Sequence, residues 1–217
     1  TVAGDLPRIG TQSHDFLSLD LGDPKAAGNA IRARMDATRP WHILIANTGG
    51  PPSGSMLDAT LEQFQAAVNS LLFTPHELVR ALVPGMKAAK FGRVVTIAST
   101  SVKQPIPNLG LSNAVRAGAA NWAKTLSQEL GPFGVTVNNV LPGYTDTERL
   151  AELFAGKAKK SGQTETSVRD DTVKLIPTGR LGKPEEIAAA VAFLCTPAAA
   201  YINGVNLPVD GGRLGTL

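Results

Sequence analysis

The stretch from Arg93 to Lys124 constrains the fold of this chain more than any other part of the sequence. It opens with a short apolar run, Val94 to Ala98, which predicts a buried strand. A cluster of hydroxyl residues follows at Ser99 to Ser101, and a proline-broken loop then leads to a helix expected from about Ser112 to Leu130. A strand, a polar loop at its carboxyl end and a returning helix are typical of the ligand sites of open α/β sheets.

Apolar runs alternate with helical patterns along the rest of the chain. The run from Trp41 to Ala46 is continuous, so we expect a strand covered on both faces. Further strands are expected at residues 14–21, 135–141 and 206–209, and further helices at residues 24–38, 61–90 and 184–195. This order predicts an α/β protein with a doubly wound, mostly parallel, Rossmann-like sheet. A length of 217 residues suits a single domain.

Local signals mark several helix boundaries. Asp23 and Pro24 look like the N-cap and first residue of a helix. Thr60 and Gln63 form a capping box for the next helix, which we expect to bend near Pro75. Residues 144–180 are too long for an ordinary connection, which predicts a lid or a substrate-binding segment.

The loops that follow three predicted strands carry most of the candidate site residues. They are Asn47 to Gly50, Ser99 to Ser101, and Pro142 to Thr147. Because ligands bind beyond the carboxyl ends of parallel strands, we expect these loops to meet around one crevice.

Composition and charge argue against several other classes of protein. The net charge is +3 with few aromatic residues, which does not favour nucleic-acid binding. No apolar run approaches the roughly 18 residues of a membrane span, and no signal peptide is visible. The single cysteine, Cys195, allows no intrachain disulfide, and no histidine has metal-ligand spacing with another candidate ligand. The simplest expectation is a cytoplasmic protein with no metal.

Several motifs together resemble the short-chain dehydrogenase/reductase family, in its 3-oxoacyl-acyl-carrier-protein reductase-like branch. The motifs lie at residues 45–49 (IANTG), 96–99 (TIAS), 142–147 (PGYTDT), 179–186 (GRLGKPEE) and 209–212 (VDGG). Each motif alone is weak, but their order and spacing resemble the family from about Asp20 to Gly212. The resemblance implies one dinucleotide-binding domain over residues 1–217, an NAD or NADP cofactor, and a small alcohol or carbonyl substrate.

The resemblance also implies roles for individual residues. Ser99 matches the serine that binds the substrate oxygen, and Asn69 matches a helix asparagine that holds a water in a proton relay. The implied cofactor-binding residues are Asp20, Asn47, Gly49, Arg116, Pro142, Gly143 and Thr145. Structural alternatives stay open for the polar residues of this set, since Asp20 could serve a turn, Asn47 its own loop, and Asn69 an ordinary hydrogen bond.

The sequence departs from the family pattern at the catalytic pair. The family's tyrosine and lysine positions fall on Ser112 and Arg116 here. An aliphatic hydroxyl is a far weaker acid than a phenol, and a guanidinium does not give up its proton. Tyr144 would face the same crevice, so we hypothesise that it supplies a proton. The alternative is a structural role, in which Tyr144 packs on its loop.

A second departure concerns the amino end, where no glycine-rich phosphate-binding turn precedes Asp20. The first two strands of the family's sheet have no counterpart in the sequence. We therefore expect the real protein to carry roughly 40 further residues before Thr1.

Three functions remain open from the sequence. The first is an NAD(P)-dependent oxidoreductase with an altered catalytic pair. The second is a non-catalytic relative that acts as a binding or assembly module. The third is a hydrolase with Ser99 or Ser112 as its nucleophile, although no histidine is placed to act as base. Members of the family pair this helix across two-fold axes, so the resemblance implies a homodimer or homotetramer. The small residues on the helix after Ser112 are Ala114, Ala117, Gly118 and Ala119.

Overall fold

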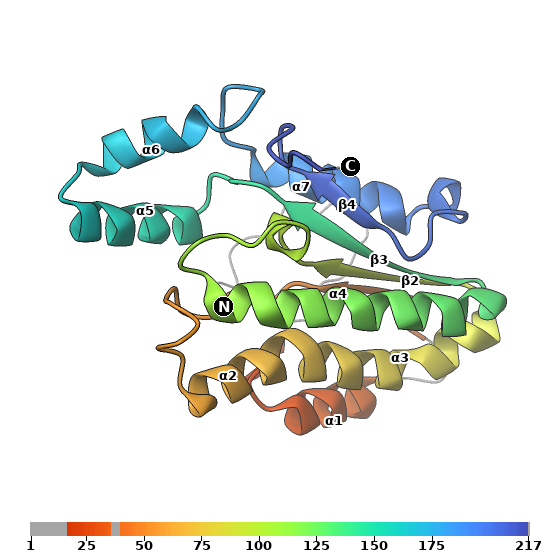
Figure 1. The fold of residues 1–217 in the computed structure, drawn as a ribbon. Helices are drawn as coiled ribbons and strands as arrows, with labels where there is room; N and C mark the ends of the chain where they lie inside the picture. The colour runs from red at the N-terminus through yellow and green to blue at the C-terminus, as the bar shows by residue number, and fades with distance from the viewer. Residues whose placement is uncertain (1–16, 36–39, 217) are drawn as a thin grey trace.

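A parallel four-stranded sheet forms the centre of the molecule (Figure 1). The computed structural model describes residues 17–35 and 40–216. The strands are β1 (Ile43–Ala46), β2 (Gly92–Ile97), β3 (Val135–Pro142) and β4 (Asn206–Val209), in the order β1-β2-β3-β4. All three pairs are parallel. The predicted single α/β domain with a parallel, Rossmann-like sheet is confirmed.

Helices cover the two faces of this sheet. The helices are α1 (Pro24–Arg34), α2 (Leu61–Val68), α3 (Thr74–Ala89), α4 (Gly110–Leu130), α5 (Glu148–Ser161), α6 (Glu165–Val173) and α7 (Pro184–Cys195). Val94 and Val95 follow one another on β2, so their side chains point to opposite faces. Val94 packs in a cluster with residues of α3 and α4, whereas Val95 packs with residues of α7. The sheet therefore lies between an α3–α4 layer and α7.

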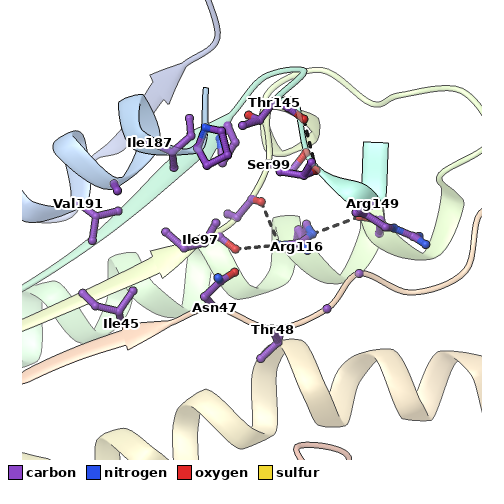
Figure 2. Close-up of a pocket in the computed structure, with 18 of the residues that line it drawn as sticks. Ile45, Asn47, Thr48, Ile97, Ser99, Arg116, Thr145, Arg149, Ile187 and Val191 are labelled. Carbon is purple, nitrogen blue, oxygen red and sulfur yellow. Dashed lines mark hydrogen bonds between the residues drawn. The ribbon is translucent and has the colours of Figure 1, made fainter. Parts of the chain in front are cut away.

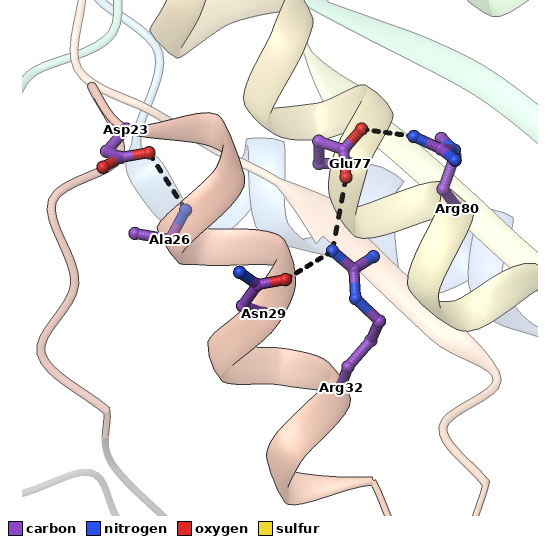
Figure 3. Close-up of polar contacts among 6 residues, drawn as sticks. All are labelled: Asp23, Ala26, Asn29, Arg32, Glu77 and Arg80. Atoms are coloured by element: carbon purple, nitrogen blue, oxygen red, sulfur yellow. Dashed lines mark hydrogen bonds and ion pairs between the residues drawn. The ribbon is translucent and has the colours of Figure 1, made fainter.

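Helix α1 forms an outer layer on α3, away from the sheet (Figures 1 and 3). Asp23 caps its first turn by accepting a hydrogen bond from the backbone of Ala26 at 3.0 Å. Arg32 of α1 lies 3.5 Å from Glu77 of α3, and Glu77 also pairs with Arg80 at 2.7 Å. These contacts hold the segment that precedes β1 against the helical layer.

The local boundary signals mostly agree with the structure. The capping box of Thr60 and Gln63 is present, and α7 and β4 have the predicted bounds. Helix α1 ends at Arg34, earlier than predicted, because Met35 is extended. Helix α4 starts at Gly110, slightly before the predicted start.

The expected bend in the helix from Leu61 takes another form. Residues Asn69–Phe73 form a π-helix between α2 and α3, immediately before Pro75. The wider turn of the π-helix places one extra residue ahead of Pro75. The proline ring then lies in the first turn of α3, where no backbone N–H is needed.

Two predictions about strands are wrong where the structure describes them. Residues 17–21 of the expected strand at 14–21 are not a strand, because no neighbouring strand pairs with them in the described part of the chain; residues 14–16 lie outside it. Strand β1 is not covered on both faces. Ile43 and Ile45 are 47% and 41% exposed, because β1 is the edge strand of the described sheet and α7 packs over β2 and β3.

Residues 144–180 contain two helices instead of an irregular loop. Helices α5 and α6 project beyond the carboxyl ends of the strands (Figure 1). They have a small core of their own, in which Leu150, Phe154 and Val168 are buried. This segment therefore has a firm internal structure, and its role as a lid remains a prediction.

Candidate functional site

A cavity of about 780 Å³ reaches the carboxyl ends of β1, β2 and β3 and extends along the exposed face of β1 to α7 (Figure 2). The loops after these three strands reach it, as the parallel sheet requires. The predicted site residues that line the cavity are Asn47, Gly49, Ser99, Ser112, Arg116, Pro142 and Thr145. The predicted convergence of the loops on one crevice is therefore present in the structure.

Ser99 lies at the carboxyl end of β2, where the chain turns into a short 3-10 helix, Thr100–Val102. Its hydroxyl oxygen accepts a hydrogen bond from the backbone N–H of Ser101 at 3.1 Å. A serine hydroxyl both donates and accepts, so this bond leaves the O–H free to donate. Because Ser99 is half-buried and lines the cavity, that donor is available to a ligand.

Ser112 and Arg116 come from successive turns of α4 and contact each other. Arg116 Nε donates to Ser112 Oγ at 3.2 Å, and Arg116 Nη1 donates to the carbonyls of Ile97 and Ala98 at 2.8 and 3.0 Å. These bonds fasten the guanidinium to the end of β2. They also occupy an acceptor site of Ser112, so that its O–H remains available to a ligand, like that of Ser99.

The charge of Arg116 is poorly solvated. Burial and, to a smaller degree, the nearby cation Arg149 lower the pKa of the Arg116 guanidinium to about 10. Within the described residues no carboxylate pairs with Arg116. The group stays protonated at neutral pH, so it acts as a fixed positive charge in the cavity wall and not as an acid or base.

Arg149 is a site residue that the sequence analysis missed. It lies in the first turn of α5 and lines the cavity beside Arg116 (Figure 2). Its Nη2 donates to the carbonyl of Pro51 at 2.9 Å and its Nη1 lies 3.2 Å from Glu152. A cation is unfavourable at a helix N-terminus, so its position was a signal that could have been used.

The loop after β3 forms another wall of the cavity. Pro142 and Thr145 line it, and the Thr145 hydroxyl donates to the carbonyl of Gly143 at 3.3 Å. Gly143 itself lies behind this wall. A Cβ at Gly143 would lie 2.7 Å from Asp210, so the loop packs on the turn after β4 in a way that a larger residue would prevent.

Besides Gly143, three predicted site residues do not line this cavity. Asp20 accepts from the backbone of Gly22, and Asn69 donates to the carbonyl of Gly22 at 3.1 Å. Tyr144 lines a separate, smaller hollow, where its ring lies under the guanidinium of Arg213. The expectation that Tyr144 faces the same crevice is wrong, because its ring packs beside the buried core of α5 and α6.

Other classes of site find no support in residues 17–35 and 40–216. There, no group of three or more His, Cys, Asp or Glu residues could hold a metal ion. His76 Nδ1 accepts a hydrogen bond from Trp122 Nε1, His42 lies edge-to-face with Phe91, and neither histidine lines the cavity. Of the helices in this part of the chain, none is long and apolar enough to cross a membrane.

The fold and the cavity define a Rossmann-like α/β protein whose ligand site lies at the carboxyl ends of its strands. Comparison with known families gives the closer assignment. The model described as enoyl-(acyl carrier protein) reductase matches residues 6–213. The chain belongs to the short-chain dehydrogenase/reductase family.

Individual relatives agree with this assignment. The 3-oxoacyl-[acyl-carrier-protein] reductase MabA of Mycobacterium bovis is 31% identical over 193 residues, which are 89% of this chain and 74% of the relative. The cyclohexanol dehydrogenase of a Rhodococcus species is 32% identical over 220 residues, 98% of this chain and 77% of the relative. The crystal structure of L-sorbose reductase from Gluconobacter frateurii, complexed with NADPH and L-sorbose, matches with a TM-score of 0.84 and 27% identity, over 92% of this chain and 76% of that one.

Proposed function

We propose that this protein is an NAD(P)-dependent oxidoreductase that interconverts a small carbonyl compound and its alcohol. The observation that supports this most is the position of Ser99, Ser112 and Arg116 around one cavity at the end of β2. L-sorbose reductase, whose structure is complexed with NADPH and L-sorbose, has the same fold at a TM-score of 0.84. We expect NADP or NAD as the cofactor.

The residues present fit the nicotinamide end of such a cofactor. Nothing lies within 4 Å of a Cβ built on Gly49, so the loop after β1 leaves an open cradle facing the cavity. Asn47, Pro142 and Thr145 would surround that end, and Arg116 offers N–H donors for ribose oxygens. When bound, the nicotinamide would supply or accept the hydride.

The chain's own residues would hold and polarise the reacting oxygen. Ser99 and Ser112 each have an O–H that their existing hydrogen bonds leave free to donate. Two donors aimed at one oxygen stabilise the negative charge that develops there as the carbonyl is reduced, and Arg116 adds a fixed positive charge beside them.

Supplying the proton that completes the alcohol is the least favourable step at this site. Arg116 stays protonated, and a serine hydroxyl is too weak an acid to release its proton unaided. We infer that Ser112, at the position of the family's tyrosine, passes a proton from water to the oxygen. This arrangement predicts slow turnover compared with relatives that have a tyrosine there.

A non-catalytic role is the second candidate, and one observation favours it. Arg116 donates to the carbonyls of Ile97 and Ala98, and these bonds fasten β2 to α4 without any ligand. The hydrolase alternative has no such support, since neither His42 nor His76 lines the cavity.

The test is to measure hydride transfer from NADPH and NADH to a panel of small ketones. We expect slow consumption of one cofactor that Ser99→Ala reduces by about ten-fold or more, because the variant removes a donor to the reacting oxygen. Ser161→Ala, which alters a hydroxyl at the far end of α5, is the matched control. Cofactor binding without turnover would favour the non-catalytic role.

A further inference from the structure

Two guanidinium groups meet at one point of the cavity wall. A Cβ built on Gly50 would lie 3.8 Å from Arg116 Nη2 and 3.9 Å from both Nε and Nη2 of Arg149. The two cations come from different elements, α4 and α5, and approach the loop after β1 from two sides (Figure 2). Like charges placed so close to each other destabilise the folded protein unless an anion lies between them.

The guanidinium groups of Arg116 and Arg149 both keep hydrogen-bond donors that no described residue uses. Arg116 donates through Nε and Nη1, and no bond of its Nη2 to another described residue is present. Arg149 uses Nη1 toward Glu152 and Nη2 toward Pro51, so its Nε has no acceptor among the described residues. Because a guanidinium has five N–H groups, each arginine still has donors to offer.

The nearest carboxylate does not neutralise the pair. Glu152 is 68% exposed at its side chain and lies 3.2 Å from Arg149 alone. A solvated pair of this kind contributes little. Arg116 has no carboxylate partner in the described part of the chain, so the cavity wall carries net positive charge where it faces Gly50.

The short distance between Arg116 and Ser112 restricts the chemical class of ligand that fits this site. Ser112 Oγ lies only 3.2 Å from Arg116 Nε. The hydroxyl that would donate to a reacting oxygen therefore lies directly beside the positively charged part of the cavity wall. A ligand that reaches both would carry its negative group within a few bonds of its carbonyl. A carboxylate suits two arginines, since its two oxygens accept parallel N–H bonds.

We propose that Arg116 and Arg149 bind an anionic group of the substrate beside Gly50, and that the substrate is a small oxo acid. This inference rests on the proposed oxidoreductase function and specifies its substrate class. In relation to that function, Arg149 is a specificity residue, because it would distinguish a charged carbonyl compound from a neutral one.

The test measures binding and does not depend on turnover. Isothermal titration calorimetry compares acetoacetate, a 3-oxo acid anion, with its neutral ethyl ester on the intact protein. Arg149→Gln should weaken acetoacetate binding by about ten-fold while the ester binds as before, which is the size expected for one charge-assisted contact. Arg149→Lys, which keeps the charge, should recover most of the loss.

A matched control separates the site from general charge effects. Arg169→Gln removes an exposed guanidinium that pairs with Asp146 in the loop before α5 and does not line the cavity. It should leave acetoacetate binding within about two-fold of the wild type. Unchanged binding in Arg149→Gln, or an equal loss for acid and ester, would overturn the proposal.

The same titration with NADP+ identifies the source of the anion. If Arg149→Gln weakens NADP+ binding and leaves acetoacetate binding unchanged, the arginines serve a cofactor phosphate and the proposal for the substrate is wrong. A protein that binds acetoacetate as predicted but consumes no NADPH would retain the anion site and refute the proposed function instead.

Discussion

At the scale of single residues, the hydrogen bonds of Ser99, Ser112 and Arg116 determine what the site can do. Both serine oxygens already accept a bond, from the Ser101 backbone and from Arg116 respectively. Each therefore presents a donor to the cavity, which suits the binding of a carbonyl or alkoxide oxygen. Neither can act as a strong acid, so the site can polarise a carbonyl better than it can protonate the product.

Restoring a phenol tests this account of Ser112. The double variant Ser112→Tyr/Arg116→Lys should raise the turnover of NADPH-dependent reduction by about ten-fold or more, because a phenol beside a cation is a competent acid. The steady-state rate with the best ketone of the panel measures the effect. Ser112→Phe/Arg116→Lys has the same ring without the hydroxyl, and an equal rise with it would show that acidity is not what the site lacks.

The sequence predicted part of the site at this scale. Ser99, Ser112 and Arg116 could be found because they occupy fixed positions relative to one strand and one helix. Arg149 was missed although its place in the first turn of a helix was a signal, because its approach to Gly50 depends on how α5 packs beyond the carboxyl ends of the strands. Tyr144 was misplaced for a related reason, because the packing of Tyr144 beside the α5–α6 core turns its ring out of the cavity.

A buried arginine that plays no part in the site should contribute strongly to stability. Arg93 is 2% exposed, and its guanidinium donates to the carbonyls of Gly92, Gly134 and Thr196. Arg93→Ala leaves these carbonyls without their donors and should lower the free energy of unfolding by about 3 kcal/mol in urea denaturation.

The exposed ion pair of Arg80 and Glu77 provides the comparison for this measurement. Arg80→Ala should change the free energy of unfolding by less than about 0.5 kcal/mol. If the two variants unfold at the same urea concentration, the buried hydrogen bonds of Arg93 contribute no more to the free energy of unfolding than the ion pair of Arg80 does.

At the scale of elements, the turn that leads into β3 depends on a glycine. Gly134 has φ of +74°, and a Cβ there would collide with the carbonyl oxygen of Lys90. Gly162 has a similar φ of +70° but open space around it. Gly162→Ala should therefore cost about 1 kcal/mol of backbone strain, and Gly134→Ala at least about 1 kcal/mol more. Equal losses in thermal unfolding would contradict the collision.

The start of α7 gives a prediction about pH. Glu186 forms a bidentate ion pair with Arg180 at 2.6 and 2.7 Å and accepts from the backbone of Lys183, which lowers the pKa of its carboxyl to about 2. Because this folded-state pKa lies below the ordinary 4.5, the stabilisation is fully present above pH 4.5 and is lost as the pH falls through about 2.

Glu186→Gln should accordingly lower the melting temperature at neutral pH, and its difference from the wild type should shrink toward zero as the pH approaches about 2. Glu185→Gln, which removes a carboxylate from the neighbouring exposed position, is the matched control. A difference that persists unchanged in acid would mean that the carboxylate charge is not responsible.

The elements themselves were largely predictable because β2, β3, β4 and α7 have the apolar runs and boundary residues that their burial requires. The predictions that failed concern segments whose structure depends on contacts with other elements. The apolar run at β1 suggested cover on both faces, yet whether Ile43 and Ile45 are covered depends on neighbouring elements and not on their own sequence. The strand expected at 14–21 failed in its described residues for the same reason.

At the scale of the whole molecule, α4 presents a surface of small residues. Ala114, Ala117 and Gly118 are exposed, whereas Ala119 is buried against the core. We predict that two copies pair through this surface. Gly118→Glu should convert a dimer to a monomer, or a tetramer to a dimer, in analytical ultracentrifugation, because it places a charge in the centre of the contact.

Gly156 of α5 offers a matched position for this experiment, since it is also an exposed helical glycine with nothing within 4 Å of a Cβ. Gly156→Glu should sediment like the wild type. A monomeric wild type, or assembly that Gly118→Glu leaves intact, would contradict a contact through α4.

The central claim is that the loops after β1, β2 and β3 together form the nicotinamide end of a cofactor site. A crystal structure of the protein soaked with NADP+ tests it most directly. We expect electron density for the nicotinamide and its ribose beside Ser99, Arg116 and Thr145. A nucleotide bound away from this cavity would contradict the claim.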